Sequence, residues 1–331
     1  MLTEEQIKGV LKDVLVPGVM RGVLGLNLVR SIEIQESEVK ISLASAALDS
    51  NAQAFVTSKT RDGVGKLAGV SGVTVDFVEA KPGDVNQVRH VITVMSGKGG
   101  VGKSAVSGLM ALALSRGNKD VGILDADITG PSIPKMFGLS ANPMGNETGL
   151  LPVSSKTGIE IMSINLLLPK EDDAVIWRGP LIGNAIKQFW EETLWGRLDY
   201  LIVDLPPGTA DAPLTVMQTI PVSGVIIVSS PQELAAMVVR KAVQMTQKMN
   251  IPIVGVVENM SYLVLPDTGQ RIDVFGKSKA DDLARVAGAP LLGQLPIDPE
   301  LARLCDEGNV ERYSSEAFES FSEAVLRVLP K

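Results

Sequence analysis

A glycine-rich segment between two apolar runs carries the residues best suited to chemistry. It fits the pattern G-x-x-x-x-G-K-[ST], whose backbone N–H groups wrap phosphates while the lysine reaches the β- and γ-phosphates and the hydroxyl ligates Mg²⁺. Residues 91–95 before it are typical of a buried strand, and residues 104–114 after it suit a packed helix, whose N-terminus attracts anions. The predicted phosphate site consists of Gly97, Lys98, Gly99, Gly100, Val101, Gly102, Lys103 and Ser104.

Two later apolar runs end in carboxylates. Asp125 and Asp127 follow the first run and share one side of an extended chain, and Asp204 ends the second at the Walker B position. Open α/β sheets bind ligands at the carboxyl ends of their strands, so these acids suit work on Mg²⁺ or water. We predict Ser104, Asp127 and Asp204 as the magnesium residues; the alternative is that Asp125 and Asp127 merely cap the following loop.

The loop after Asp204 has the composition of a nucleotide sensor. It reads Leu-Pro-Pro-Gly-Thr-Ala-Asp, a rigid segment with one permissive glycine. Such a loop can sense a γ-phosphate as a switch does. The predicted switch II residues are Pro207, Gly208, Thr209 and Asp211.

Alternating strands and helices must position these groups. From residue 90 to 331, apolar strands alternate with helical segments, which predicts an α/β P-loop NTPase with a mostly parallel sheet. Residues 1–81 follow the order α-β-β-α-β and predict a small α+β domain. Residues 82–89 are rich in proline, glycine and polar residues and predict a linker.

Composition excludes several classes of function. The 331 residues include one cysteine, Cys305, and one histidine, His90, so no intramolecular disulfide or Cys/His zinc site can form. The few cysteines and an acidic N-terminus without signal-peptide character favour a cytoplasmic protein. The net charge of −7 argues against nucleic-acid binding, and a final helix with an acidic face argues against an anionic membrane.

The second lysine of the loop, Lys98, makes the segment resemble the deviant Walker A motif of the SIMIBI class. Four further runs resemble the Mrp/NBP35/ApbC branch: LDADITGPSIP (124–134), WRGP (177–180), DLPPGTAD (204–211) and VENMSY (257–262). The resemblance implies a homodimer that binds and slowly hydrolyses ATP with Mg²⁺. Its implied catalytic residues are Lys98, which would touch the partner's phosphates, Lys103, and Asp127, which would orient water. Lys98 as a solvated surface lysine stays an open alternative.

The same resemblance implies the base pocket and the cargo. Asn259 would read adenine, and the backbone near Pro296 would line the pocket. Members of this branch resemble carriers that hand a [4Fe–4S] cluster to apoproteins or work with assembly factors. The usual Cys-x-x-Cys ligands are replaced here by Leu265 and Thr268, so we find no cluster ligands, and Cys305 is expected to be structural.

Two alternatives to a direct carrier follow: a cluster-free adaptor ATPase, or a positioning ATPase like the Min and Par proteins. The N-terminal segment resembles the MIP18-type (DUF59) domain in length and element order. Where that family has Asp-Pro-Glu and Cys-Pro, this chain has Val-Pro-Gly (16–18) and Ser-Ala-Ala-Leu (45–48). We therefore expect a docking module rather than a metal-binding one.

Overall fold

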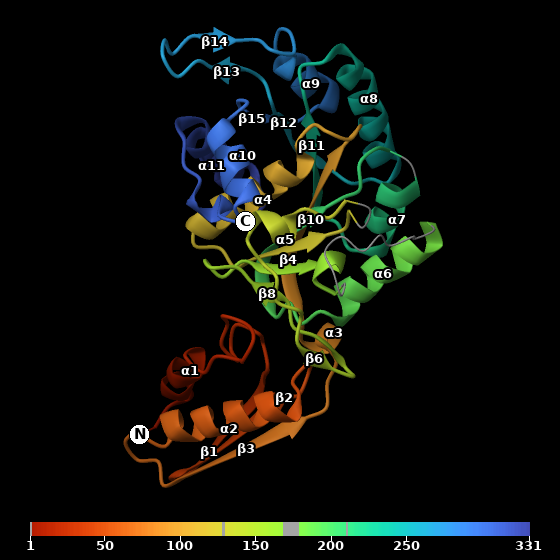
Figure 1. Ribbon diagram of the computed structural model, residues 1–331. Helices are drawn as coiled ribbons and strands as arrows, with labels where there is room; N and C mark the ends of the chain where they lie inside the picture. The colour runs from red at the N-terminus through yellow and green to blue at the C-terminus, as the bar shows by residue number, and fades with distance from the viewer. Residues whose placement is uncertain (1, 128–129, 168–178, 210) are drawn as a thin grey trace. The chain divides into compact units, whose positions relative to one another are not determined.

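The computed structural model describes residues 2–127, 130–167, 179–209 and 211–331 (Figure 1). The chain divides into two compact units. Unit 1 comprises Met1–Arg89, Asn142–Ser154 and Gln188–Leu198, and unit 2 comprises His90–Ala141, Ser155–Lys187 and Asp199–Lys331. Unit 1 therefore takes in two segments that the sequence analysis assigned to the ATPase domain.

Unit 1 is built on a three-stranded sheet with two helices. Its first five elements, in the expected order, are α1 (Glu4–Lys12), β1 (Val29–Gln35), β2 (Glu38–Ala44), α2 (Ser50–Val64) and β3 (Gly72–Val78). A capping box of Thr3 and Gln6 starts α1. Strand β2 pairs antiparallel with β1 and parallel with β3. The apolar residues spaced along α1 and β2 are buried and form a core: Ile7, Leu11, Val39, Ile41 and Leu43.

Short elements complete unit 1. They are α3 (Pro82–Val85), β6 (Gly145–Asn146), β7 (Gly149–Leu150) and β8 (Val153–Ser154). The expected linker, residues 82–89, thus holds α3 and the start of β4. Arg21 anchors the later segments of the unit to its beginning, because the guanidinium donates to the carbonyl oxygen of Trp195 at 3.0 Å.

Unit 2 contains a large parallel sheet. Its strands are β4 (Gln87–Ser96), β5 (Val121–Asp125), β9 (Glu160–Ser163), β10 (Arg197–Asp204), β11 (Gly224–Ser229), β12 (Ile253–Glu258) and β15 (Leu291–Gln294). They lie in the order β15-β12-β11-β4-β10-β5-β9. Strand β11 pairs in parallel with β4 and β12, and β5 pairs in parallel with β10 and β9. Strands buried on both faces explain the continuous apolar runs of the sequence.

Helices flank this sheet (Figure 1). They are α4 (Lys103–Arg116), α5 (Ile133–Met136), α6 (Gly179–Glu192), α7 (Asp211–Thr219), α8 (Glu233–Lys248), α9 (Ala280–Ala287), α10 (Pro299–Asp306) and α11 (Glu316–Val328). Helix α4 is buried continuously from Val106 to Leu114, as its small and apolar sequence predicts, and it packs against α11 and β5. The observed unit confirms the predicted α/β class with a mostly parallel sheet.

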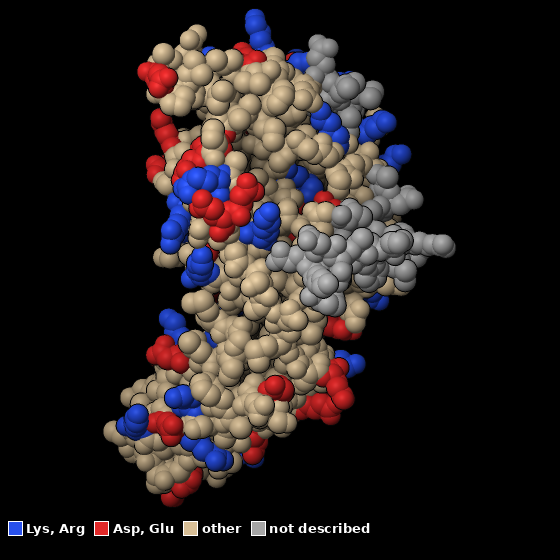
Figure 2. All heavy atoms as spheres, in the orientation of Figure 1, with Lys and Arg blue, Asp and Glu red and all other residues tan. Residues whose placement is uncertain are grey.

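Two observations concern the surface. Within the described residues, every helix is too short or too polar to span a bilayer. On the face drawn in Figure 2, acidic and basic side chains are interspersed, and the described residues of that face form no continuous basic patch.

Candidate functional site

The glycine-rich loop joins β4 to α4 in the conformation that its sequence predicts. Gly100 and Gly102 have φ angles of +79° and +76°, a region that favours glycine, and Gly102 directly precedes α4. A Cβ atom on Gly102 would lie 2.2 Å from Asn259 Nδ2. Backbone conformation and space therefore both require glycine at this position, where the loop meets the helix N-terminus.

Lys103 and Ser104 meet the carboxylate of Asp204 in the interior. Lys103 Nζ lies 2.8 Å from Asp204 Oδ1 and 3.9 Å from Asp127 Oδ2. Ser104 Oγ donates to Asp204 Oδ2 at 2.5 Å, and Ser107 Oγ donates to Oδ1 at 2.6 Å. Both Lys103 and Asp204 are buried, so this ion pair lies in a medium of low dielectric constant. The lysine thus rests on the acids, with the hydroxyl of Ser104 beside it.

Asp125 and Asp127 have separate environments. Asp125 is fully buried, and its carboxylate accepts from the backbone N–H of Asp127 at 3.2 Å and of Ile133 at 3.4 Å, and from Ser163 Oγ at 3.1 Å. Burial above all, and then the nearby Asp204 charge, raise the pKa of Asp125 to about 8. Asp127 instead lines the cavity described below. Asp125 therefore holds the loop, and Asp127 faces the space where a ligand would lie.

The predicted switch II segment is tied to the glycine-rich loop through the backbone. The N–H of Gly208, at φ +97°, donates to the carbonyl oxygen of Ser96 at 2.9 Å, and Pro207 lines the cavity. Thr209 follows, and the backbone of Asp211 begins α7. The side chain of Asp211 lies outside the described residues, as do residues 128, 129, 177, 178 and 210 of the runs that carry the family resemblance.

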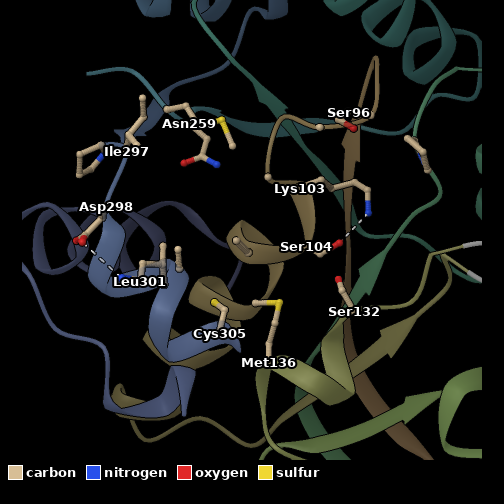
Figure 3. Close-up of a pocket in the computed structure, with 18 of the residues that line it drawn as sticks. Ser96, Lys103, Ser104, Ser132, Met136, Asn259, Ile297, Asp298, Leu301 and Cys305 are labelled. Atoms are coloured by element: carbon tan, nitrogen blue, oxygen red, sulfur yellow. Dashed lines mark hydrogen bonds between the residues drawn. The ribbon is translucent and has the colours of Figure 1, made fainter. Parts of the chain in front are cut away.

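A cavity of about 590 Å³ opens above these groups, a volume typical of small-molecule sites. Figure 3 shows Asn259, Ile297 and Leu301 on one side of it and Lys103 and Ser104 on the other. Asn259 is 6% exposed, and its Nδ2 donates to the carbonyl oxygen of Val101 at 2.9 Å. The predicted base-reading residue therefore also anchors the phosphate loop. Pro296 also lines the cavity.

Lys98 lies apart from the carboxylates. Its Nζ hydrogen-bonds Oε1 of Gln232, and the carbonyl oxygen of Lys98 accepts from Ser96 Oγ at 2.9 Å. Gln232 was not predicted, because only the pairing of Val228 on β11 with Ser96 on β4 brings the two loops together. Ser107 was also missed, although its place one helical turn after Ser104 was a usable signal.

The residues at the usual cluster-ligand positions lie in a two-stranded hairpin of β13 (Leu263–Val264) and β14 (Arg271–Ile272). Leu265 and Thr268 offer no thiolate there. Cys305 lines the cavity from α10, and burial, followed by the charge of Asp306, raises the pKa of its thiol to about 11. One cysteine per chain supplies too few sulfur ligands for such a cluster. An iron–sulfur cluster therefore does not fit the ligands of this chain.

Most of the chain matches a known protein family. Residues 87–329 match the model of a ParA family described as the NUBPL iron-transfer P-loop NTPase. The chain belongs to this family. The NUBPL-type match covers unit 2 almost entirely, and it confirms the family predicted from the sequence runs; the DUF59 resemblance of residues 1–81 stays a prediction.

Individual proteins that are similar to this chain support the same family. An iron–sulfur cluster carrier protein of Clostridium perfringens is 44% identical over 248 residues, 72% of this chain and 87% of that protein. A carrier protein of the same description from Synechocystis is 37% identical over 324 residues, 93% of this chain and 91% of that protein. A nucleotide-binding protein of Archaeoglobus fulgidus, solved with ADP, has 46% identity and a TM-score of 0.63, covering 71% of this chain and 92% of its own. Two MinD structures, at 19% and 20% identity, share the fold alone.

Proposed function

We propose that the chain binds ATP with Mg²⁺ in the cavity of unit 2, hydrolyses it slowly, and serves iron–sulfur cluster transfer to apoproteins as an ATP-dependent adaptor. One observation carries the nucleotide part: the glycine-rich loop, Lys103 and Ser104 line a cavity that Asn259 and Pro296 also line, and Asp204 binds both Lys103 and Ser104. The loop suits a triphosphate, and the rest of the lining suits a base.

The carboxylates around Lys103 favour the binding of a divalent cation together with the nucleotide. Asp127 and Asp204 lie around the ammonium of Lys103, so a triphosphate would add negative charge to an acidic centre. In the described part of the chain, no three histidine, cysteine or acidic side chains form a metal cage. Mg²⁺ commonly uses one or two carboxylates together with substrate phosphates. Ser104 Oγ and Asp204 Oδ2, 2.5 Å apart, fit that arrangement, and Mg²⁺ would neutralise phosphate charge there.

Hydrolysis needs a positioned water and a cation near the γ-phosphate. Asp127 lines the cavity and is the residue we assign to orienting that water. Lys103 would leave Asp204 for the phosphates once nucleotide enters. Lys98, held by Gln232 at the edge of the loop, is assigned to the phosphates of a second copy, so the active form would be a homodimer. The switch II residues Pro207, Gly208, Thr209 and Asp211 would transmit the nucleotide state.

The iron–sulfur role rests on the family and on the named relatives. Because the hairpin has Leu265 and Thr268 where ligands are expected, the chain would act beside a partner that holds the cluster. Unit 1 would dock that partner, and the chain would work in the cytoplasm. A Min- or Par-like positioning role gains no support: the last helix, α11, begins with Glu316 and Glu319 in its first turn, which suits neither DNA nor an anionic membrane.

Phosphate release from ATP tests the proposal. The full chain should release phosphate from ATP when Mg²⁺ is present, and this release should stop when EDTA removes the Mg²⁺. Lys103→Ala or Asp127→Ala should lower turnover about 100-fold or more. Lys119→Ala, an exposed lysine just beyond α4, is the matched control and should keep full turnover. Equal turnover in Lys103→Ala and Lys119→Ala would remove the assignment.

The adaptor part is tested by anaerobic reconstitution with iron and sulfide. The purified chain should retain no stoichiometric iron or sulfide. A stable brown protein with cluster absorption would instead make the chain a direct carrier.

A further inference from the structure

Phe275 is an aromatic side chain in an unusual place. It follows β14 and is 38% exposed, whereas Phe137, Phe318 and Phe321 are among the largest fully buried side chains. It also lines the nucleotide cavity, and among the described lining residues it is the one aromatic. Ligand cavities are commonly lined by aromatic side chains, so a half-exposed ring within this one suits contact with a ligand.

The root of the hairpin fixes the end of the cavity at which Phe275 lies. The N–H of Ile297 donates to the carbonyl oxygen of Tyr262 at 2.7 Å, and Leu263 forms a parallel bridge with Ile297. Ile297 lies with Asn259 across the cavity from Lys103 (Figure 3). The hairpin therefore rises on the side of the cavity that carries Asn259 and Ile297, across from Lys103.

A buried carboxylate clamps both ends of the hairpin. Glu258, fully buried, accepts from Ser261 Oγ at 2.5 Å on the entering side, and from Ser278 Oγ at 2.6 Å and the N–H of Lys279 at 2.8 Å on the returning side. The next residue is Asn259, which holds the phosphate loop. The base of the hairpin and the nucleotide site are thus joined through two consecutive residues.

The segment that carries Phe275 is held much more loosely than its base. Residues 273–277 are all exposed, and their backbone N–H groups make short turns, such as that from the N–H of Gly276 to the carbonyl oxygen of Asp273 at 3.2 Å. Gly276 has φ +93° with open space around it. A firm base with a glycine beside the aromatic residue lets the ring adjust to a ligand.

We propose that Phe275 stacks on the base of the bound nucleotide, so that ATP binding orders the hairpin at residues 263–276. This inference rests on the proposed ATP site and adds to it a base-contacting residue and a conformational readout. Stacking of a base on an aromatic side chain is sequence-tolerant and strong enough that its loss weakens binding about tenfold or more. A ligand that has phosphates but no base should keep its affinity, because it does not contact Phe275.

Equilibrium titration of the full chain with two probes, Mg–ATP and inorganic tripolyphosphate, separates these effects. Phe275→Ala should raise the Kd for ATP about tenfold and leave that for tripolyphosphate unchanged, and Phe275→Trp should restore ATP affinity. Val274→Ala, 48% exposed and outside the cavity lining, is the matched control and should bind both as the wild type does. Amide exchange in residues 263–276 should slow with ATP in the wild type and not in Phe275→Ala.

Two results would overturn the inference while leaving the proposed function intact. One is an unchanged ATP affinity in Phe275→Ala. The other is an equal loss for ATP and tripolyphosphate, which would mean that the hairpin acts on the phosphate end. A wild-type chain that binds neither probe would instead overturn the proposed ATP site, and this inference with it.

Discussion

Replacing Asp125 with asparagine should change how the stability of the chain depends on pH. The carboxyl is fully buried beside Asp204 and Asp127, and its pKa is raised from 3.8 to about 8, chiefly by burial. In the unfolded chain the same carboxyl is ionised above about pH 4. Between these pKa values the folded state holds a proton that the unfolded state has lost, so stability falls as pH rises.

The size of the effect follows from the two pKa values. Each pH unit between 3.8 and about 8 changes the free energy of unfolding by about 1.4 kcal/mol, so the step from pH 5 to pH 7 costs the wild type about 2–3 kcal/mol. An asparagine side chain cannot ionise, so Asp125→Asn lacks this contribution, while its amide oxygen can still accept the N–H of Asp127. Relative to the variant, the wild type should lose about 5 °C in Tm over that range.

Calorimetry of both proteins at pH 5 and pH 7, at constant ionic strength and without nucleotide, measures this difference. Asp76→Asn is the control, because Asp76 is half exposed and paired with Lys40 at 3.4 Å on the surface of unit 1. A wild-type-minus-variant difference in Tm that changes by less than about 1 °C between the two pH values would refute the reasoning. So would a change of the opposite sign, which would mean that Asp125 is ionised in the folded state.

The remaining predictions concern the loop and its anchor. Gly102→Ala should lower both Tm and ATP affinity, because a left-handed backbone costs a non-glycine residue about 1–2 kcal/mol and the Cβ would meet Asn259 Nδ2 at 2.2 Å. Gly130→Ala, with nothing within 4 Å, is the control, and equal losses in both variants would contradict the account. Asn259→Ala removes the hydrogen bond to Val101 and should weaken Mg–ATP binding about three- to tenfold by titration; an unaltered Kd would argue against an anchoring role.

The sequence predicted those parts of the site that are formed by residues adjacent to one another in the chain. The loop from Gly97 to Ser104 needed only its own glycines and the flanking strand and helix. Asp125 and Asp204 were expected together because parallel strands end at one edge of a sheet, and the two are register partners on β5 and β10.

Contacts between distant segments could not be predicted in this way. The contact of Lys98 with Gln232 and the place of Phe275 in the cavity arise from loops that meet only in the folded sheet. Cys305 was expected to be a buried or half-buried structural residue, and it is half-buried; its place in the cavity lining could not be predicted from its own helix. Segments 142–154 and 188–198 belong to unit 1, and hydrogen bonds such as those of Ala47 with Thr148 and of Arg21 with Trp195 tie them to it without any local signal in the sequence.

Calorimetric titration of the full chain with Mg–ATP tests the central claim most directly. The claim predicts binding of one nucleotide per chain, lost in Lys103→Ala and retained in Lys119→Ala. Absence of binding to the wild type, or the same affinity in Lys103→Ala, would contradict it.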